Sequence, residues 1–316
     1  MISNSIKVAR NLHQRMGSPL GKLHSTVERR WNDFNGLAGP MRHVRRISFK
    51  ARHLPEIIQR KTQAEKLTQG PLNPEIAARA REYREKGLSF ITDLVDPQLL
   101  AELLRFYDEV VTERSKTAVG SSTHPFFFVL EEAADFTTDH ILVRFALQDS
   151  VVAAVTACFG SVPILTGICI NESRHVKIET KKQRASQQWH LDYSSDGSEF
   201  IAVWVYLTPV PTVAQGPLTI IPADISRKSR HKLHLGRIQD EEIEAAGLAD
   251  EIKPVLGPRG TVFMVSTGEC YHMGSRCHPG ENRVMCQFAF SKSGDHKNFV
   301  KITAPVPDEK KMVICR

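Results

Sequence analysis

The chain has 316 residues, of which 41% are hydrophobic and 24% charged, so it has the composition of a globular protein and can bury a sizeable core. Its longest apolar runs, such as FIAVWVYL (200–207), are far shorter than the roughly 20 residues of a membrane-spanning helix, and we see no signal-peptide pattern. None of the six cysteines forms a CxxC pair, which argues against a structural zinc site and favours reduced thiols in a cytosolic-type compartment.

The net charge of +7 is concentrated near the N-terminus. Residues 1–70 carry 14 Lys/Arg against four Asp/Glu, whereas the remaining 246 carry 28 against 31. We therefore predict a basic N-terminal extension over residues 1–72. Such a segment suits a nucleic acid, an anionic membrane or an import receptor, but a solvated extension is the simplest interpretation. We expect neither a nucleic-acid nor a membrane partner, and a cytoplasmic location, with organelle import as the alternative in a eukaryote.

Regular helical patterns begin at residue 73. In NPEIAARAREYREKG (73–87), Asn73 is a suitable N-cap, Pro74 a suitable first residue and Gly87 a stop. LSFITDLV (88–95) then resembles a short strand, and DPQLLAELLRFYDEVVTER (96–114) a long amphipathic helix. FFFVLEE (126–132) suggests another strand, and residues 137–160 suggest one or two helices. We thus predict mostly helical support over residues 73–160.

After Gly160 the sequence becomes rich in short β-type runs. They are PILTGICI (163–170), HVKIE (175–179), QWHLDYS (188–194), EFIAVWVYLTPV (199–210), GPLTIIP (216–222), GTVFMVSTG (260–268) and NRVMCQFAFS (282–291). Many short strands at near-regular spacing indicate a sandwich or barrel, which we place at residues 161–300. Residues 240–251 form a small helical insert. Residues 73–316 are thus predicted to make a single domain.

Two histidines and one aspartate form an unusual group. His190 and Asp192 are separated by one residue, so on a strand both side chains point to the same face. His272 follows another apolar strand. Two imidazoles and a carboxylate on one side of a metal leave its other side open, which suits non-haem Fe(II) with sites for a cosubstrate and O₂. Arg283 lies 11 residues beyond His272 and can bind a carboxylate through two parallel hydrogen bonds. These features suit 2-oxoglutarate, whose oxo-acid end the metal would hold and whose distant carboxylate Arg283 would bind.

The order of HLD (190–192), Trp204, GPLTIIP (216–222), His272 and Arg283 resembles the phytanoyl-CoA dioxygenase family of Fe(II)/2-oxoglutarate-dependent oxygenases. The resemblance covers roughly residues 85 to 295. It implies a mainly β fold with flanking helices, whose core is a double-stranded β-helix, or cupin-like jelly roll. It also implies that His190, Asp192 and His272 bind iron, that Arg283 binds 2-oxoglutarate and that Trp204 lines the cosubstrate pocket.

A basic stretch, SRKSRHKLHLGR (226–237), follows the GPL strand, where the resemblance places a loop near the mouth of the site. KKQR (181–184) precedes the HLD segment. Two basic loops beside one opening would favour an anionic substrate such as a phosphate, carboxylate or CoA derivative, although a solvated loop is the alternative. We take Arg227, Lys228 and Arg230 as candidate substrate-binding residues.

The sequence therefore predicts an Fe(II)/2-oxoglutarate-dependent dioxygenase that hydroxylates a small molecule and releases succinate and CO₂. Asp192 favours hydroxylation over halogenation, because its carboxylate occupies the position that a halogenating relative leaves for chloride. Desaturation and cyclisation are alternatives within the same class. The alternative outside it is a non-catalytic jelly roll that binds a metal or ligand.

Overall fold

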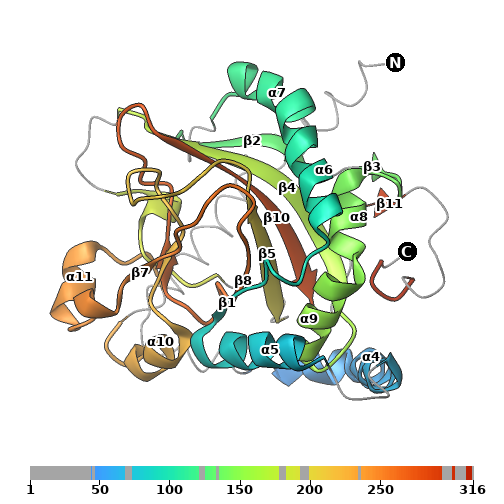
Figure 1. The fold of residues 1–316 in the computed structure, drawn as a ribbon. Helices are drawn as coiled ribbons and strands as arrows, with labels where there is room; N and C mark the ends of the chain where they lie inside the picture. Colours follow the sequence, from blue (N-terminus) through green and yellow to red (C-terminus); the bar gives the residue numbers. More distant parts are fainter. Residues whose placement is uncertain are drawn as a thin grey trace, which may run out of the picture.

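The computed structural model describes most of the chain beyond residue 46. The described residues are 44, 47–67, 73–120, 125–132, 135–177, 183–192, 199–233, 236–293, 301–302 and 311–314. Most of the predicted basic extension and Lys181 and Lys182 of the KKQR run lie outside them. Figure 1 shows strands at the centre of the molecule and helices around them.

The core is built from antiparallel strands in two sheets. The larger sheet has the order β1 (Leu88–Phe90), β8 (Val262–Val265), β5 (Phe200–Tyr206), β10 (Asn282–Ser291), β4 (Ile164–Arg174) and β2 (Phe127–Glu132). A smaller sheet has the order β7 (Lys253–Pro254), β6 (Thr219–Ile220) and β9 (His272–Met273). Separately, β3 (Asp135–Phe136) pairs in parallel with β11 (Lys301–Ile302). The mainly β fold with flanking helices is thus confirmed.

The larger sheet is apolar on both faces, which explains the unbroken apolar run of β5. Ile201, Val203 and Val205 belong to the main core beneath the helices. The alternate residues Ala202, Trp204 and Tyr206 belong to a second core, which also contains Ile220 of the smaller sheet. Because successive side chains of a strand point to opposite faces, β5 lies between these two cores. The second core, between the two sheets, is the interior of the jelly roll.

Helices cover the outer face of the larger sheet. They are α5 (Pro74–Lys86), α6 (Pro97–Phe106), α7 (Thr112–Thr117), α8 (Ile141–Leu147) and α9 (Asp149–Phe159). The predicted caps are present: the Asn73 side chain accepts from the Glu75 N–H, and that of Asp96 from the Gln98 N–H. In Figure 1, α6, α8 and α9 lie along one side of this sheet, while β7 and α11 (Asp240–Ala245) lie on the other. The helical half thus supports the sheet from outside.

Helix α4 (Leu54–Leu67) lies within the predicted extension, yet it packs on the domain. Arg60 is only 4% exposed and donates to the carbonyl oxygens of Val162, Pro163 and Met312 at 3.4, 3.5 and 2.6 Å. Ala64 is part of the main core. Packing therefore extends N-terminal to the predicted boundary at residue 72.

Several elements differ from the sequence expectation. The predicted helix 96–114 is interrupted by a π-helix, Tyr107–Val111, between α6 and α7. In QWHLDYS, Trp189 and His190 form isolated β-bridges rather than a strand, and His175–Lys177 of HVKIE is not a strand. The remaining residues of these two predicted strands, 193–194 and 178–179, lie outside the described ones. The first part of the basic stretch is a helix, α10 (Ala223–Ser229), and 3₁₀ turns occupy Ala185–Gln187 and Ala249–Glu251.

No single helix among the described residues is long and apolar enough to cross a membrane, although the bent pair α8 and α9 passes that test jointly. Both helices contribute many side chains to the main core.

Candidate metal centre

Backbone pairing brings His190 and His272 together across 82 residues of sequence. The two residues face each other in an antiparallel bridge, and each N–H donates to the other's carbonyl oxygen at 2.9 Å. Residues directly opposite in such a pair project their side chains to the same face. The two imidazole rings accordingly lie with centroids 4.1 Å apart.

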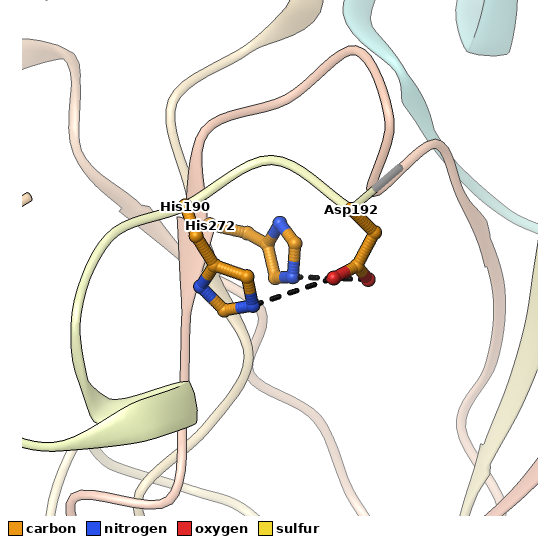
Figure 2. A group of neighbouring side chains, drawn as sticks. All are labelled: His190, Asp192 and His272. Carbon is orange, nitrogen blue, oxygen red and sulfur yellow. Dashed lines mark ion pairs between the residues drawn. The ribbon is translucent and has the colours of Figure 1, made fainter. Parts of the chain in front are cut away.

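Asp192 joins this pair because it lies two residues beyond His190 and its N–H donates to the Thr267 carbonyl oxygen at 2.9 Å. Figure 2 shows both imidazoles directed toward the Asp192 carboxylate. Its Oδ1 lies 3.4 Å from Nε2 of His190, and its Oδ2 lies 3.4 Å from Nε2 of His272. One ligand atom from each of the three residues lies within 4.8 Å of the others.

The remaining ring nitrogens fix the tautomer of both histidines. Nδ1 of His190 lies 2.8 Å from the Gln188 carbonyl oxygen, and Nδ1 of His272 lies 3.2 Å from that of Cys270. A carbonyl oxygen can only accept, so each Nδ1 carries a proton in the neutral ring and each Nε2 presents a lone pair. Backbone carbonyls in this position orient metal-binding histidines in many proteins.

Burial and charge shape the electrostatics of the group. His190 and His272 are 7% and 5% exposed. Burial lowers the pKa of His190, and the opposing effect of the Asp192 carboxylate does not reverse the shift. Burial by itself would raise the pKa of Asp192, but the two neighbouring histidines, His272 above all, outweigh it and hold that pKa well below its usual range. Asp192 is therefore ionised at neutral pH.

This donor set fits a divalent metal with nitrogen and oxygen ligands. Two imidazole lone pairs and a carboxylate converge on one point, and this arrangement is repulsive unless a proton or a metal ion lies between them. Imidazole and carboxylate are the ligands of non-haem Fe(II) sites. The Asp192 side chain is 44% exposed, so the group is accessible from its side.

Arg283 lies close to the His272 segment and is the second residue of β10. An added Cβ on Gly274, two residues after His272, would lie 3.6 and 3.7 Å from its two terminal nitrogens. Arg283 is 2% exposed, and burial lowers its pKa. Its Nε and Nη1 atoms have no hydrogen-bond partner among the described residues. A buried guanidinium with unused donors is suited to bind a carboxylate.

Trp204 projects from β5 into the second core. It is 7% exposed, and its ring lies 5.7 Å from that of Phe263 on the neighbouring strand β8. Its Nε1 also has no hydrogen-bond partner among the described residues. Trp204 and Met285 both belong to the second core, and Arg283 is two residues from Met285, so Arg283 and Trp204 project from the same face of the sheet.

The candidate substrate residues lie on or just after α10 and have protein partners or face solvent. Arg227 donates to the Glu85 carbonyl oxygen at 3.2 Å, and Arg230 forms an ion pair with Glu269 at 2.7 Å. Lys228 is exposed. Their role in substrate binding remains a prediction.

Arg237, at the end of the same basic stretch, interacts electrostatically with Asp192 of the His–Asp–His group. It precedes Ile238, which forms a bridge with Trp189, and it donates to the Ala185 carbonyl oxygen at 3.0 Å. Burial lowers the pKa of Arg237 while the Asp192 carboxylate acts to raise it. Sequence reasoning noted this residue only as part of a basic run, because its closeness to Asp192 depends on the bridge.

Sequence reasoning also missed the residues that hold the HLD segment in place. Asp240 on α11 accepts from Nε1 of Trp189 at 2.8 Å and from two guanidinium nitrogens of Arg276 at 2.8 and 2.9 Å. Arg276 also donates to the Gln187 carbonyl oxygen. These contacts use the guanidinium of Arg276 for structure, and no local sequence pattern distinguishes it from an exposed arginine.

Two antiparallel sheets with a His–Asp–His group at their edge are the arrangement of a jelly-roll metal oxygenase. The model of the phytanoyl-CoA dioxygenase (PhyH) family matches residues 83–283. The chain therefore belongs to this family, as its motifs predicted, and so to the class of non-haem iron, 2-oxoglutarate-dependent oxygenases.

The chain is also similar to several solved structures. EctD from S. alaskensis in its apo form is 13% identical, with a TM-score of 0.50 over 75% of this chain and 89% of its own. The epimerase SnoN, solved with Fe3+, alpha ketoglutarate and nogalamycin RO, is 16% identical, with a TM-score of 0.48 over 74% of this chain and 97% of its own. HygX from Streptomyces hygroscopicus, solved with nickel and 2-oxoglutarate, is 11% identical, with a TM-score of 0.45 over 70% and 87%. At 13% identity the likeness to EctD concerns the fold alone. No curated protein matches the sequence significantly.

Proposed function

We propose that this protein is a hydroxylase that uses Fe(II), 2-oxoglutarate and O₂ to oxidise a small molecule. The observation that carries the proposal is the convergence of His190, Asp192 and His272, with both Nε2 atoms 3.4 Å from the carboxylate. Family membership supplies the class of chemistry. Bound iron and 2-oxoglutarate together supply the oxidation, in which decarboxylation of the keto acid is coupled to oxidation of the substrate.

The residues of the chain have distinct roles in this proposal. The triad would hold the metal and leave its other side accessible, because among the described residues only these three side chains converge there. Arg283 binds the distal carboxylate of 2-oxoglutarate through its unused donors. Trp204 forms part of the apolar wall inside the jelly roll, where water is excluded.

Hydroxylation is the proposed outcome because Asp192 supplies a carboxylate ligand where a halogenating relative would leave space for chloride. The proposed substrate is small and anionic. Support for its charge comes from Arg237, whose cation interacts with Asp192 although it also binds the Ala185 carbonyl. Arg227, Lys228 and Arg230 are proposed as further, more distant contributors.

The decisive test needs no knowledge of the substrate. Fe(II) and then 2-oxoglutarate are added anaerobically to the purified protein, and the weak visible charge-transfer band is recorded. Air is then admitted and succinate is measured. We expect the band and slow uncoupled succinate release. Protein that gives neither would contradict the proposal, and a band without succinate would favour the non-catalytic alternative.

Asp192→Ala should abolish both signals, because it removes one of three protein ligands. Asp108→Ala is the matched control, since Asp108 is a surface carboxylate in an ion pair with Arg259. It should retain both signals at the wild-type level.

A further inference from the structure

The buried guanidinium of Arg283 contacts two side chains of the described protein, the phenol of Tyr206 and the hydroxyl of Ser173. Its Nη2 donates to Oγ of Ser173 at 3.2 Å, while Nε and Nη1 find no partner among the described residues. Ser173 lies directly opposite Arg283 in the register of β4 and β10, and it is 1% exposed. A guanidinium only donates, so the serine oxygen must be the acceptor.

Ser173 is in turn held by Ser275. Their Oγ atoms lie 2.8 Å apart, and Ser275 is 2% exposed. Since a hydroxyl oxygen has two lone pairs, Ser173 can accept from Arg283 and from Ser275 at once. Ser275 lies three residues after His272, so this pair of hydroxyls connects the segment of a metal-binding histidine to the strand of Arg283.

Ser275 has a backbone conformation that favours glycine. Its φ is 61°, in the left-handed region. The conformation is fixed by its N–H, which donates to the Gly216 carbonyl oxygen at 3.2 Å, and by its carbonyl oxygen, which accepts from Nε2 of Gln187 at 3.1 Å. Glycine would adopt this conformation more easily, and the property that serine adds is the hydroxyl directed at Ser173.

We propose that Ser173 and Ser275 are positioning residues that orient the guanidinium of Arg283 for the distal carboxylate of 2-oxoglutarate. Arginine has many rotamers, and holding its planar group in the binding orientation reduces the entropy lost when the carboxylate binds. The inference rests on the proposed function, because it takes 2-oxoglutarate as the ligand of Arg283.

The test compares two 2-oxo acids that differ in the distal carboxylate. Calorimetry under anaerobic conditions measures the Kd of 2-oxoglutarate and of pyruvate for the Fe(II)-loaded wild type, Ser173→Ala and Ser275→Gly. We expect the 2-oxoglutarate Kd to rise about tenfold in Ser173→Ala and about threefold or more in Ser275→Gly. The Kd values for pyruvate and for Fe(II) should not change, because neither ligand reaches Arg283.

Ser275→Gly is not expected to disrupt folding, since glycine adopts the left-handed backbone conformation of this position without strain. A weaker affinity in this variant would therefore report the loss of the hydroxyl. Ser89→Ala is the control, because Ser89 is fully buried on β1 and bonds to Glu82 instead. It should bind 2-oxoglutarate like the wild type.

Unchanged 2-oxoglutarate affinity in both serine variants would overturn the inference, as would an equal loss for pyruvate, which would indicate a general structural effect. A wild-type protein that binds no 2-oxoglutarate would instead refute the proposed function, and this inference with it.

Discussion

Arg283 and Arg60 are both buried arginines, but they differ in what surrounds the charge. Arg60 is 4% exposed, and its guanidinium donates to Glu56 and to three carbonyl oxygens. Arg283 is 2% exposed, and two of its nitrogens have no partner among the described residues. A buried charge with unmet donors destabilises a fold, whereas one that is hydrogen-bonded does so much less. Arg283 therefore lowers stability, as the carboxylate-binding role proposed for it would require.

We predict that Arg283→Met increases the free energy of unfolding of the ligand-free protein by about 1–3 kcal/mol, because it removes an uncompensated buried charge. The same change should weaken 2-oxoglutarate binding by about 2–4 kcal/mol. Urea denaturation and calorimetry measure the two effects. Arg60→Met is the matched control and should destabilise the protein, because it leaves buried carbonyls without a donor. If Arg283→Met destabilised the protein as much as Arg60→Met does, the hydrogen-bond donors of Arg283 would be satisfied in the ligand-free protein.

The triad predicts a metal-dependent stability. In the proposed site, Fe(II) would bind the folded group and not the separated residues of the unfolded chain, so at 100 times its Kd it should stabilise the fold by about 2.7 kcal/mol. We expect anaerobic Fe(II) to raise the thermal midpoint and a chelator to reverse the rise. His272→Ala should remove this response. A metal-induced rise that persists in His272→Ala would place the bound metal elsewhere.

At the scale of elements, the junction between α5 and β1 packs against the segment that leads to His272. Gly87 ends α5 with a φ of 74°, and an added Cβ there would lie 2.3 Å from Sγ of Cys270 and 2.8 Å from Cβ of Ala223. Gly160 ends α9 with a φ of 64°, but nothing lies within 4 Å of an added Cβ. The two glycines thus share a backbone conformation and differ only in their surroundings.

This pair separates backbone strain from steric overlap. Gly160→Ala should cost about 1 kcal/mol of unfolding free energy, the cost of a left-handed alanine. Gly87→Ala should cost about 2–4 kcal/mol, because overpacking adds to the same strain. Denaturant unfolding measures both. Equal losses of unfolding free energy in the two variants would mean that the segment around Cys270 moves aside freely. In that case, a weaker metal affinity in Gly87→Ala would show that His272 moves with this segment.

At the scale of the whole molecule, the described part of the basic N-terminal segment belongs to the fold. Phe49 is 6% exposed, and α4 contributes Arg60 and Ala64 to the packing. By contrast, Leu54 and Ile58 of α4 are 51% and 56% exposed. The charged Arg60 therefore anchors the helix more than those aliphatic side chains do.

The contribution of α4 can be measured by comparing a chain that starts at residue 44 with one that starts at residue 73. A chain starting at residue 73 should lose about 2–4 kcal/mol of stability, because the carbonyls of Val162, Pro163 and Met312 lose their donor and Ala64 leaves the core. Thermal and urea unfolding of both chains test this. An unchanged midpoint in the shorter chain would mean that α4 contributes no net stability and that residue 72 is the true boundary.

The sequence by itself determined the features that depend on neighbours along the chain. The caps at Asn73 and Asp96 were predictable because an N-cap bonds to backbone groups two or three residues away. The shared face of His190 and Asp192 follows from the two-residue period of extended backbone. The order of these residues with His272 and Arg283 then sufficed to identify the family, and hence the jelly roll.

Tertiary structure alone decided which distant groups meet. The bridge between His190 and His272 depends on the register of two segments 82 residues apart, and the bond between Ser173 and Ser275 spans 102 residues. No local sequence pattern distinguishes the three buried or half-buried arginines Arg60, Arg276 and Arg283. They differ in the hydrogen-bond acceptors that the fold brings to each. Such partners are set by the packing of sheets and helices, which no local pattern encodes, because burial and hydrogen bonding are properties of surroundings that exist only after folding.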